Sequence, residues 1–425
     1  MSGAANPGCS RLSGGPPDPT CYNRSMRKAF LILAIASTVL SAASRPKIRA
    51  ITAFLDLDAK TYDAQIRETV QFLNSARDAY RAAGFEVEGI RIATQPFARY
   101  TAGMSHDEAL TFLQHLQDLA SQLRFAPSIG PAMVGDGDDP AAVDLLIDIL
   151  SKMRFNASLV IAGEDGIHWN AIKQAARLVK QVSIRSTHSQ GNFNFAAIAM
   201  VAPNGPFYPG AYHLGGPRAF AVGFEAANVV EDVFKRDRDP KNAEKNLAAA
   251  LAGYTREAES VATRLAQNSG WTYAGIDPTP APMGDVSIAR AMEAFTGAPF
   301  GSSGTMTAAA IITRAVQATP VKHTGYTGLM VPVLEDNLLA KRWAEGTYTI
   351  DSLLAYSAVC AGGLDTVPLP GDTTEDQLAR IYGDVATLAY KWHKPLAARL
   401  LPVAGKKSGD RTEFQNNALM NTTIR

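Results

Sequence analysis

Cysteine is scarce in this chain, and neither sign of charge is in excess. The sequence holds three cysteines, Cys9, Cys21 and Cys360, and its 41 lysines and arginines nearly balance its 40 aspartates and glutamates. Beyond the N-terminal region Cys360 is alone, which excludes an intramolecular disulfide and a multi-cysteine metal site. Without a block of positive charge the chain lacks the footprint that phosphate backbones require, so we expect no nucleic acid partner.

Long hydrophobic runs are also lacking. The run AFLILAIASTVL has twelve residues, well short of the roughly 20 that span a bilayer. It follows the basic MRK at Met26 and precedes SAAS, which is the pattern of a secretory signal peptide at residues 26–44, cleaved near Ala43 or Ser44. We therefore expect a secreted or periplasmic protein without a stable membrane span; the alternative is a membrane anchor formed by the uncleaved segment.

The first 25 residues contain much Gly, Pro and Ser and show no hydrophobic period. Such a segment cannot bury a core, so we interpret residues 1–25 as a disordered leader or as an artefact of an upstream start codon. The remaining chain is different, because 46% of all residues are hydrophobic and only 19% are charged. No Pro/Gly/Ser linker divides it, and we expect one domain over residues 45–425.

Strands and helices alternate along this domain. The run KIRAITAFLDL favours a strand, Ile66, Val70 and Leu73 recur on one helical face, and FEVEGIRIA alternates with a period of two. Ser105 and Glu108 form a predicted capping box before the next helix. Alternation of this kind predicts a mainly parallel α/β sheet or barrel.

Two loop segments repeat each other. GIDPTPAPMGD at residues 275–285 and GLDTVPLPGD at residues 363–372 share an Asp followed by a PxP run, and each leads into a helix. Proline stiffens such a loop, so Asp277 and Asp365 are held in place. If both point into one cavity, they can serve as a general acid and base or bind a divalent metal ion. The alternative is that each accepts hydrogen bonds from its own turn.

The segment STHSQGNFNFAAIAMVAPNGPFYPGAYHLGGPRAF surrounds a strand with polar loops, where sites are often built. It supplies four candidates: Asn192, Tyr212 and Arg218 for substrate contact, and His213 as a general base. A structural, hydrogen-bonded histidine is the alternative for His213.

Three other loops contribute candidates. FGSSGTMT places Gly304 and Thr305 at a helix start, where free amides favour an anion, although an ordinary helix cap explains them too. The loop lacks both the P-loop and the GxGxxG patterns, so neither ATP nor NAD is expected. Tyr326 lies in HTGYTGLMVPVLED, and Lys406 and Lys407 in VAGKKSGD offer cations to an acidic substrate or form a solvated turn.

The blocks AYHLGGPRAFAVGFE, GIDPTPAP, FGSSGT, YTGLMVPVLED, GLDTVPLPGDTT and RLLPVAGKKSGDRTEF resemble the DUF711 family of PFL-like proteins, over nearly all of residues 47–421. The resemblance implies a ten-stranded α/β barrel of two half-barrels, each a parallel half-sheet, packed antiparallel. It does not imply glycyl radical chemistry, because Cys360 is alone and the tail QNNALMNTTIR contains no glycine. It implies no particular activity.

We therefore expect an exported enzyme of lyase or hydrolase type that acts on a small polar or anionic metabolite inside the barrel. Asp277, Asp365 and His213 are the predicted catalytic residues. The alternative is a non-catalytic small-molecule binding protein outside the cytoplasm. A homo-oligomer is compatible with the sequence, and the substrate is not encoded in any motif.

Overall fold

A computed structural model describes residues 45–425, so the predicted leader and signal peptide lie outside the described residues. Export and the division of the chain into leader, signal and domain stay predictions. The strands are β1 (Lys47–Leu55), β2 (Ile90–Thr94), β3 (Ala126–Pro131), β4 (Asn156–Gly163), β5 (Gly166–Ile167), β6 (Phe195–Ala199), β7 (Ala219–Glu225), β8 (Thr272–Asp277), β9 (Gly362–Pro370) and β10 (Leu396–Val403).

The predicted capping box of Ser105 and Glu108 is present at the start of its helix. The helices are α2 (Tyr62–Ala82), α3 (Phe97–Tyr100), α4 (His106–Leu123), α5 (Ala141–Lys152), α6 (Trp169–Arg185), α7 (Ala227–Arg236), α8 (Pro240–Ser269), α9 (Ile288–Thr296), α10 (Thr305–Gln317), α11 (Asn337–Glu345), α12 (Ile350–Ser357) and α13 (Glu375–Trp392), with a 3₁₀ segment, η1 (Thr187–Asn194).

The ten strands form one mixed sheet in the order β8-β7-β1-β2-β3-β4-β6-β10-β9, with the short β5 paired to β4. Strands β1, β2, β3, β4 and β6 are parallel, which makes one half-sheet. The pairs β7–β8 and β10–β9 are each parallel and join its two margins in the opposite direction. The predicted α/β class with ten strands and two half-sheets of opposite direction is therefore confirmed.

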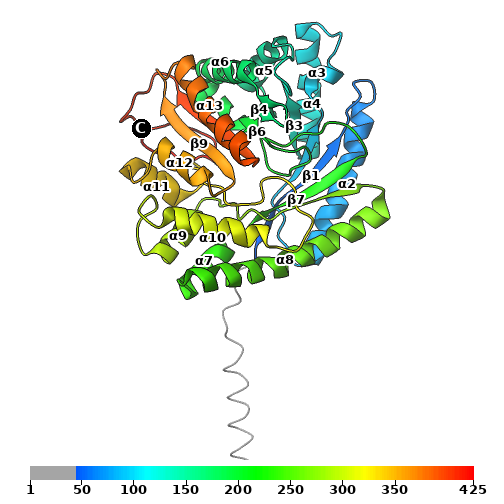
Figure 1. Ribbon diagram of the computed structural model, residues 1–425. Coiled ribbons are helices and arrows are strands. Elements are labelled where there is room, and N and C mark those ends of the chain that lie inside the picture. Colours follow the sequence, from blue (N-terminus) through cyan, green and yellow to red (C-terminus); the bar gives the residue numbers. More distant parts are fainter. Residues whose placement is uncertain (1–44) are drawn as a thin grey trace, which may run out of the picture. The chain divides into compact units, whose positions relative to one another are not determined.

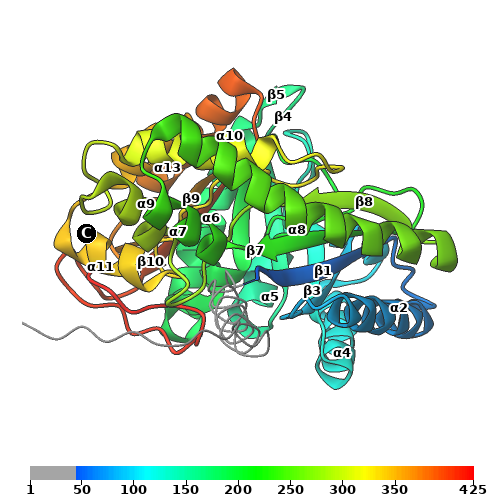
Figure 2. The same cartoon turned by 90° about the horizontal axis from the view of Figure 1, so that it is seen from below.

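The helices pack as a ring outside the sheet (Figures 1 and 2). Going round the ring, neighbouring helices contact one another in the order α2, α4, α5, α6, α13, α12, α10, α8 and back to α2. Helix α4, for example, packs beside β3 and buries Leu113, Leu116 and Ala120. The ring of helices therefore covers the outer face of the sheet. Loops cover the inner face of the sheet.

No hydrogen-bonded ladder joins the edge strands β8 and β9 within residues 45–425. The segment 322–334 contacts both edges instead. Next to β8, the Ile276 amide donates to the Lys322 carbonyl at 2.8 Å, and next to β9 the Val333 amide donates to the Asp365 carbonyl at 2.9 Å. One stretch of chain thus spans the gap between the two strands that carry the repeated Asp motif.

The loop between β6 and β7, residues 200–218, occupies the inner face of the sheet. The Pro206 carbonyl accepts a hydrogen bond from Thr52 of β1 at 2.9 Å. The Tyr208 hydroxyl donates to the Ile92 carbonyl of β2 at 2.7 Å. Because these bonds satisfy buried polar groups, the loop is fixed against the strands and not free in solvent.

Small residues on the inner face make room for this loop. Gly223 of β7 faces the Phe207 ring, and a Cβ at residue 223 would lie only 3.1 Å from it. A Cβ at Gly210 would lie 2.7 Å from the Tyr326 hydroxyl. The loop packs so closely that a side chain at either position would force the Phe207 ring or the Tyr326 hydroxyl to shift.

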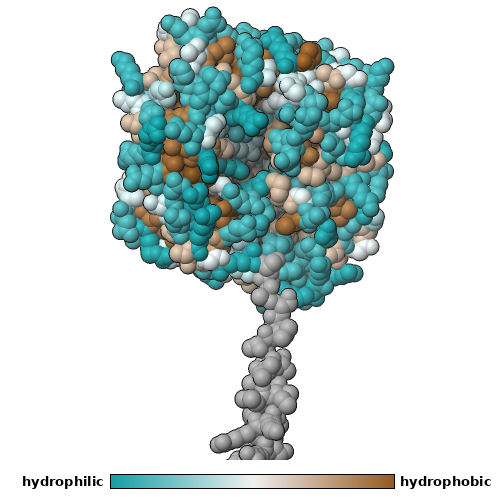
Figure 3. Space-filling view, turned by 180° about the vertical axis from the view of Figure 1, so that it is seen from behind, coloured by the Kyte–Doolittle hydropathy of each residue, from teal (hydrophilic) through white to brown (hydrophobic). Residues whose placement is uncertain are grey.

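Among residues 45–425, the exposed large hydrophobic side chains include Trp169, Ile184 and Trp392. On the face drawn in Figure 3, hydrophilic residues predominate and hydrophobic ones form small patches. Within residues 45–425, no helix has the length and apolar character needed to cross a membrane. Cys360 is a free, buried thiol, and burial raises its pKa to about 11.

Candidate functional site

A cavity of about 250 Å³ lies on the inner face of the sheet. Strands from both half-sheets contribute to its wall, and so do the loop 200–218 and the segment 322–334. Its charged and polar lining consists of Arg49, Arg91, Arg399, Glu335, Asp365, Asn156, Asn194, Tyr208 and Tyr326. The volume suits a small metabolite better than a nucleotide, because pockets for drug-sized ligands usually start near about 300 Å³.

Arg399 of β10 is the centre of the acidic side of this cavity. Its Nη1 lies 2.6 Å from Glu335 and 2.8 Å from Asp365, and its Nη2 donates to the Phe193 carbonyl at 2.8 Å. The guanidinium also lies 4.6 Å from the Phe193 ring centre. All three charged side chains are at most 15% exposed, so this is a desolvated network in which each charge depends on its partner.

Arg49 of β1 joins this network to a second acidic pair. Its guanidinium lies 3.7 Å from Glu335 on one side, and 2.8 Å and 3.3 Å from Glu88 and Glu225 on the other. Burial, and then the neighbouring Glu88 carboxylate, raise the pKa of Glu225 to about 7. Near neutral pH, Glu225 therefore exchanges between its neutral and ionised forms.

Arg91 of β2 is a cation without a counter-ion. No carboxylate of the described residues lies within 4.0 Å of it; its Nη1 donates only a long 3.4 Å hydrogen bond to the Pro206 carbonyl. The guanidinium lies over the Tyr208 ring, 4.7 Å from the ring centre. Burial, and then the nearby Arg49 charge, lower its pKa to about 10, so it is still cationic at neutral pH. An unpaired guanidinium in a cavity wall favours an anionic ligand.

Asp365 of β9 lines the cavity, as the sequence predicts. Burial raises its pKa to about 6, although the Arg399 guanidinium favours the ionised form. Tyr326, another predicted contact residue, lines the same cavity. A carboxyl group whose pKa is close to neutral can both take and return a proton at physiological pH.

Asp277, the last residue of β8, does not line the cavity. Its side chain is fully buried and accepts hydrogen bonds from Thr279 at 2.6 Å and from the amides of Tyr326 at 2.7 Å and Thr327 at 3.1 Å. Burial raises its pKa to about 6. Asp277 thus holds the segment that carries Tyr326, and the structure does not bring the two repeated carboxylates together in the cavity.

We predict that Asp277→Asn lowers the free energy of unfolding by about 1–3 kcal/mol, because an amide offers one acceptor oxygen where the carboxylate offers two. Urea unfolding followed by circular dichroism measures the loss. Asp285→Asn is the matched control, since Asp285 lies in the same motif and, among the described residues, its carboxylate accepts one exposed hydrogen bond, from the side chain of Asn337. Equal stability of the wild type and Asp277→Asn would contradict the anchoring role.

His213, Tyr212 and Asn192 are buried away from the cavity lining. The His213 ring contacts Asn204 at 2.9 Å, and burial lowers its pKa. The Tyr212 hydroxyl donates to the Val201 carbonyl at 2.7 Å, and the Asn192 amide donates to Val179 at 2.8 Å. Tyr212 and His213 thus bond within the loop 200–218, and Asn192 ties η1 to helix α6.

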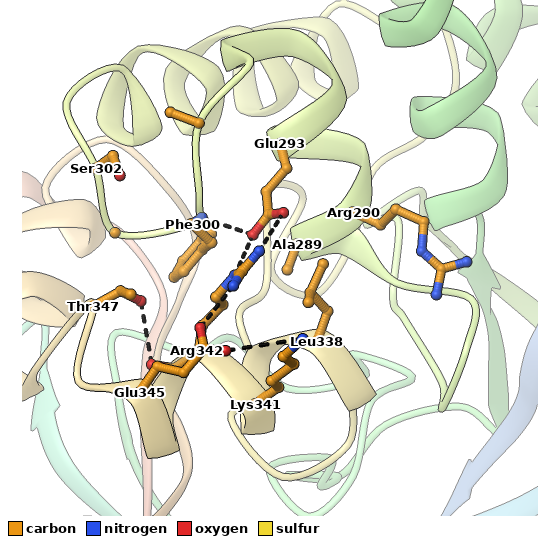
Figure 4. Close-up of polar contacts among 12 residues, drawn as sticks. Ala289, Arg290, Glu293, Phe300, Ser302, Leu338, Lys341, Arg342, Glu345 and Thr347 are labelled. Carbon is orange, nitrogen blue, oxygen red and sulfur yellow. Dashed lines mark hydrogen bonds and ion pairs between the residues drawn. The ribbon is translucent and has the colours of Figure 1, made fainter.

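Gly304 and Thr305 begin α10 in a loop that is fixed by its own contacts. The Thr305 hydroxyl accepts from the Gly301 amide at 3.1 Å and donates to the Ser302 carbonyl at 2.8 Å. Figure 4 shows how Glu293 of α9 binds Arg342 of α11 and the Phe300 amide of this loop. The helix start therefore has the contacts of a structural cap, and it lies outside the cavity lining.

The remaining cationic candidates form surface contacts. Arg218 binds Glu68 at 2.6 Å and lies over Trp271. Lys406 binds Glu413 at 2.8 Å, and the Lys407 amide donates to Asp410. Within the described part of the chain, no group of three or more His, Cys, Asp or Glu side chains is arranged to hold a metal ion.

Sequence reasoning overlooked the three cavity arginines. Arg49, Arg91 and Arg399 each stand within a strand that is otherwise largely apolar: KIRAITAFL, IRIAT and LAARLLPV. A charged residue within a buried strand is a usable signal, because burial of a lone charge is costly unless it is paired or functional. Glu335 directly precedes Asp336, which is the N-cap of α11.

A profile of the protein family described as "Uncharacterised ACR (DUF711)" matches residues 41–416. The chain belongs to this family. Members of the DUF711 family similar to it include a UPF0210 protein of Methanopyrus kandleri, 31% identical over 79% of this chain and 78% of that protein. A UPF0210 protein of Pyrobaculum arsenaticum is 35% identical over 64% of this chain, but the match spans only 62% of that relative.

Among solved structures, an anaerobic ribonucleotide reductase covers 91% of this DUF711 chain at 9% identity, with a TM-score of 0.28. A likeness this distant carries no information on activity.

Proposed function

We propose that this DUF711 protein binds a small anionic metabolite in the inner cavity and converts it by acid–base chemistry, as a lyase or hydrolase acting outside the cytoplasm. One observation carries the proposal: an unpaired guanidinium, Arg91, shares a small cavity with Asp365, a carboxyl group whose pKa is about 6. Such an enzyme needs at least one group that binds the anion and one neighbouring group that transfers a proton.

The residues divide the work as follows. Arg91 binds the carboxylate of the ligand, because it forms no ion pair with a carboxylate of residues 45–425. Arg399 orients Asp365 through the 2.8 Å contact and favours its ionised form. Ionised Asp365 takes a proton from the ligand or from a water molecule, and the protonated acid returns it to the leaving group. Tyr326 contacts the ligand from the segment 322–334.

Non-catalytic binding is the second candidate. It is favoured by one observation, namely that both lining carboxylates, Glu335 and Asp365, are already bound by Arg399. A site that only holds its ligand has no need of a free base. The two candidates share the anion site and differ in whether the bound molecule is changed.

The experiment that separates them uses Asp365→Asn. We expect the wild type to consume a member of a mixture of small hydroxy, amino and dicarboxylic acids, followed by NMR, and Asp365→Asn to lose about 100-fold or more of that rate while it still binds. Since Asp365 acts as a base when ionised, the wild-type rate should fall as the pH drops below about 6.

Asp372→Asn is the control, because Asp372 lies in the same repeated motif but is exposed at the surface. Binding without turnover in all three proteins would favour the binding protein. If the wild type neither binds nor converts any of these acids, the proposal is wrong.

A further inference from the structure

A second hollow of about 550 Å³ adjoins the inner cavity. Its wall comes from the end of α5 with residues 151–154, from η1 and the preceding Ser186, and from residues 415–417. Asn194 lines both hollows. The two spaces are therefore neighbours that share part of one wall.

The outer hollow is polar and positively charged. Lys152 and Arg154 belong to its lining, and no Asp or Glu is among the described residues that form it. Neither cation makes an ion pair with a carboxylate within residues 45–425. A concave surface of one charge sign concentrates ligands of the opposite sign, so this hollow attracts anions.

The C-terminal strap, residues 410–424, crosses between the two hollows. Its flanks are held to each other: the Thr412 amide donates to the Thr422 carbonyl at 2.9 Å, and the Ile424 amide donates to the Asp410 carbonyl at 2.8 Å. The Thr422 hydroxyl ties the strap to the Ala340 carbonyl of α11 at 2.6 Å. Both flanks are thus fixed to the domain.

The tip of the strap, residues 415–418, lies between two buried hydrophobic side chains, Phe414 and Leu419, and makes fewer hydrogen bonds to the rest of the domain than the flanks do. The Gln415 amide donates to the Gln190 side chain at 3.0 Å, whereas the Ala418 and Leu419 amides donate only to Asn416, within the tip itself. Residues 415–417 face the outer hollow, and Ala418 lines the inner cavity. The tip therefore separates the outer hollow from the inner cavity and lines both.

We infer that the outer hollow is the entrance of the site: small carboxylates gather at Lys152 and Arg154, pass the strap tip as it swings aside, and reach Arg91. This inference rests on the proposed anionic ligand. Ala418, on the cavity side of the tip, then sets the length of ligand that fits when the strap closes.

Charge reversal tests the entrance. In the variant Lys152→Glu/Arg154→Glu, we expect the association rate of ¹³C-labelled succinate, measured by NMR exchange at low salt, to fall about tenfold, and the difference to vanish at about 1 M salt, where the screening length is near 3 Å. Lys241→Glu/Lys245→Glu on α8 is the control, because it makes the same change of net charge on another element. An unchanged rate in the first variant would place the entrance elsewhere and leave the proposed function standing.

Two further measurements complete the test. Ala418→Leu should weaken succinate binding at least tenfold and leave acetate unaffected, since the larger side chain shortens the cavity. Without any ligand, the amides of Asn417 and Ala418 should exchange with deuterium faster than those of Thr412 and Thr422. Equal protection of all strap amides from exchange would contradict the inferred motion of the tip. This outcome can be read even if no carboxylate binds and the proposed function fails.

Discussion

Arg91→Ala is expected to abolish the binding of small carboxylates and to leave the fold intact. Removal of one partner of a buried charge pair in a complex costs about 2–5 kcal/mol, which corresponds to a loss of affinity of roughly 30-fold to several thousandfold. The free protein loses little, because Arg91 has no ion pair to break within the described residues. Titration calorimetry with the acid found by NMR measures the loss.

Arg91→Lys distinguishes charge from geometry. If the ligand is bound by two parallel hydrogen bonds, lysine recovers only part of the affinity, because an ammonium group cannot form them with one carboxylate in the same way. Arg99→Ala is the control, since Arg99 is exposed on α3 and outside the cavity. Wild-type affinity in Arg91→Ala would remove the basis of the proposed function.

The second large effect concerns stability. Arg399→Met should lower the free energy of unfolding by about 3–5 kcal/mol, because it leaves Glu335 and Asp365 buried without their shared cation. Methionine keeps much of the side-chain volume, so the loss reports on charge and not on a cavity. Urea unfolding at pH 7 measures it.

The loss of unfolding free energy in Arg399→Met should depend on pH. Without Arg399 the pKa of Asp365 rises further above that of an unfolded aspartate, so the folded state takes up protons and gains stability as the pH falls. The difference between Arg399→Met and the wild type should therefore shrink from pH 7 to pH 5. Arg314→Met, which removes an exposed pair with Glu244, is the control and should cost less than about 1 kcal/mol. A loss that does not vary with pH would point to packing alone.

The fold class could be predicted from the sequence because local hydrophobic patterns indicate where strands and helices lie. The periods of two and of about four residues mark the strands and helices, and caps such as Ser105 fix where helices begin. What these patterns do not contain is the order of strands across the chain. The position of β7 beside β1, and of β10 beside β6, depends on long-range pairing that no local window reports.

The candidate site could be predicted only in part. Asp365 and Tyr326 line the cavity, and both lie in Gly/Pro-rich segments whose special conformation is visible in the sequence. Asp277 shares the motif of Asp365 but not its surroundings, since the neighbouring Thr279 turns its carboxylate toward backbone amides. The same order of Gly, an aliphatic residue and Asp thus occurs in two environments, and the packing around it decides which role the Asp takes.

The repeated motif has a consequence for how the protein tolerates change. In one copy, Asp277 accepts a hydrogen bond from the segment 322–334, which spans the gap between β8 and β9. In the other copy, the Asp365 carboxyl group lines the inner cavity. Because the two aspartates have different roles, neither can replace the other. Loss of Asp277 should loosen the segment that carries Tyr326, and loss of Asp365 should remove the proposed proton-transfer group. A protein that lacks both should show the two defects together.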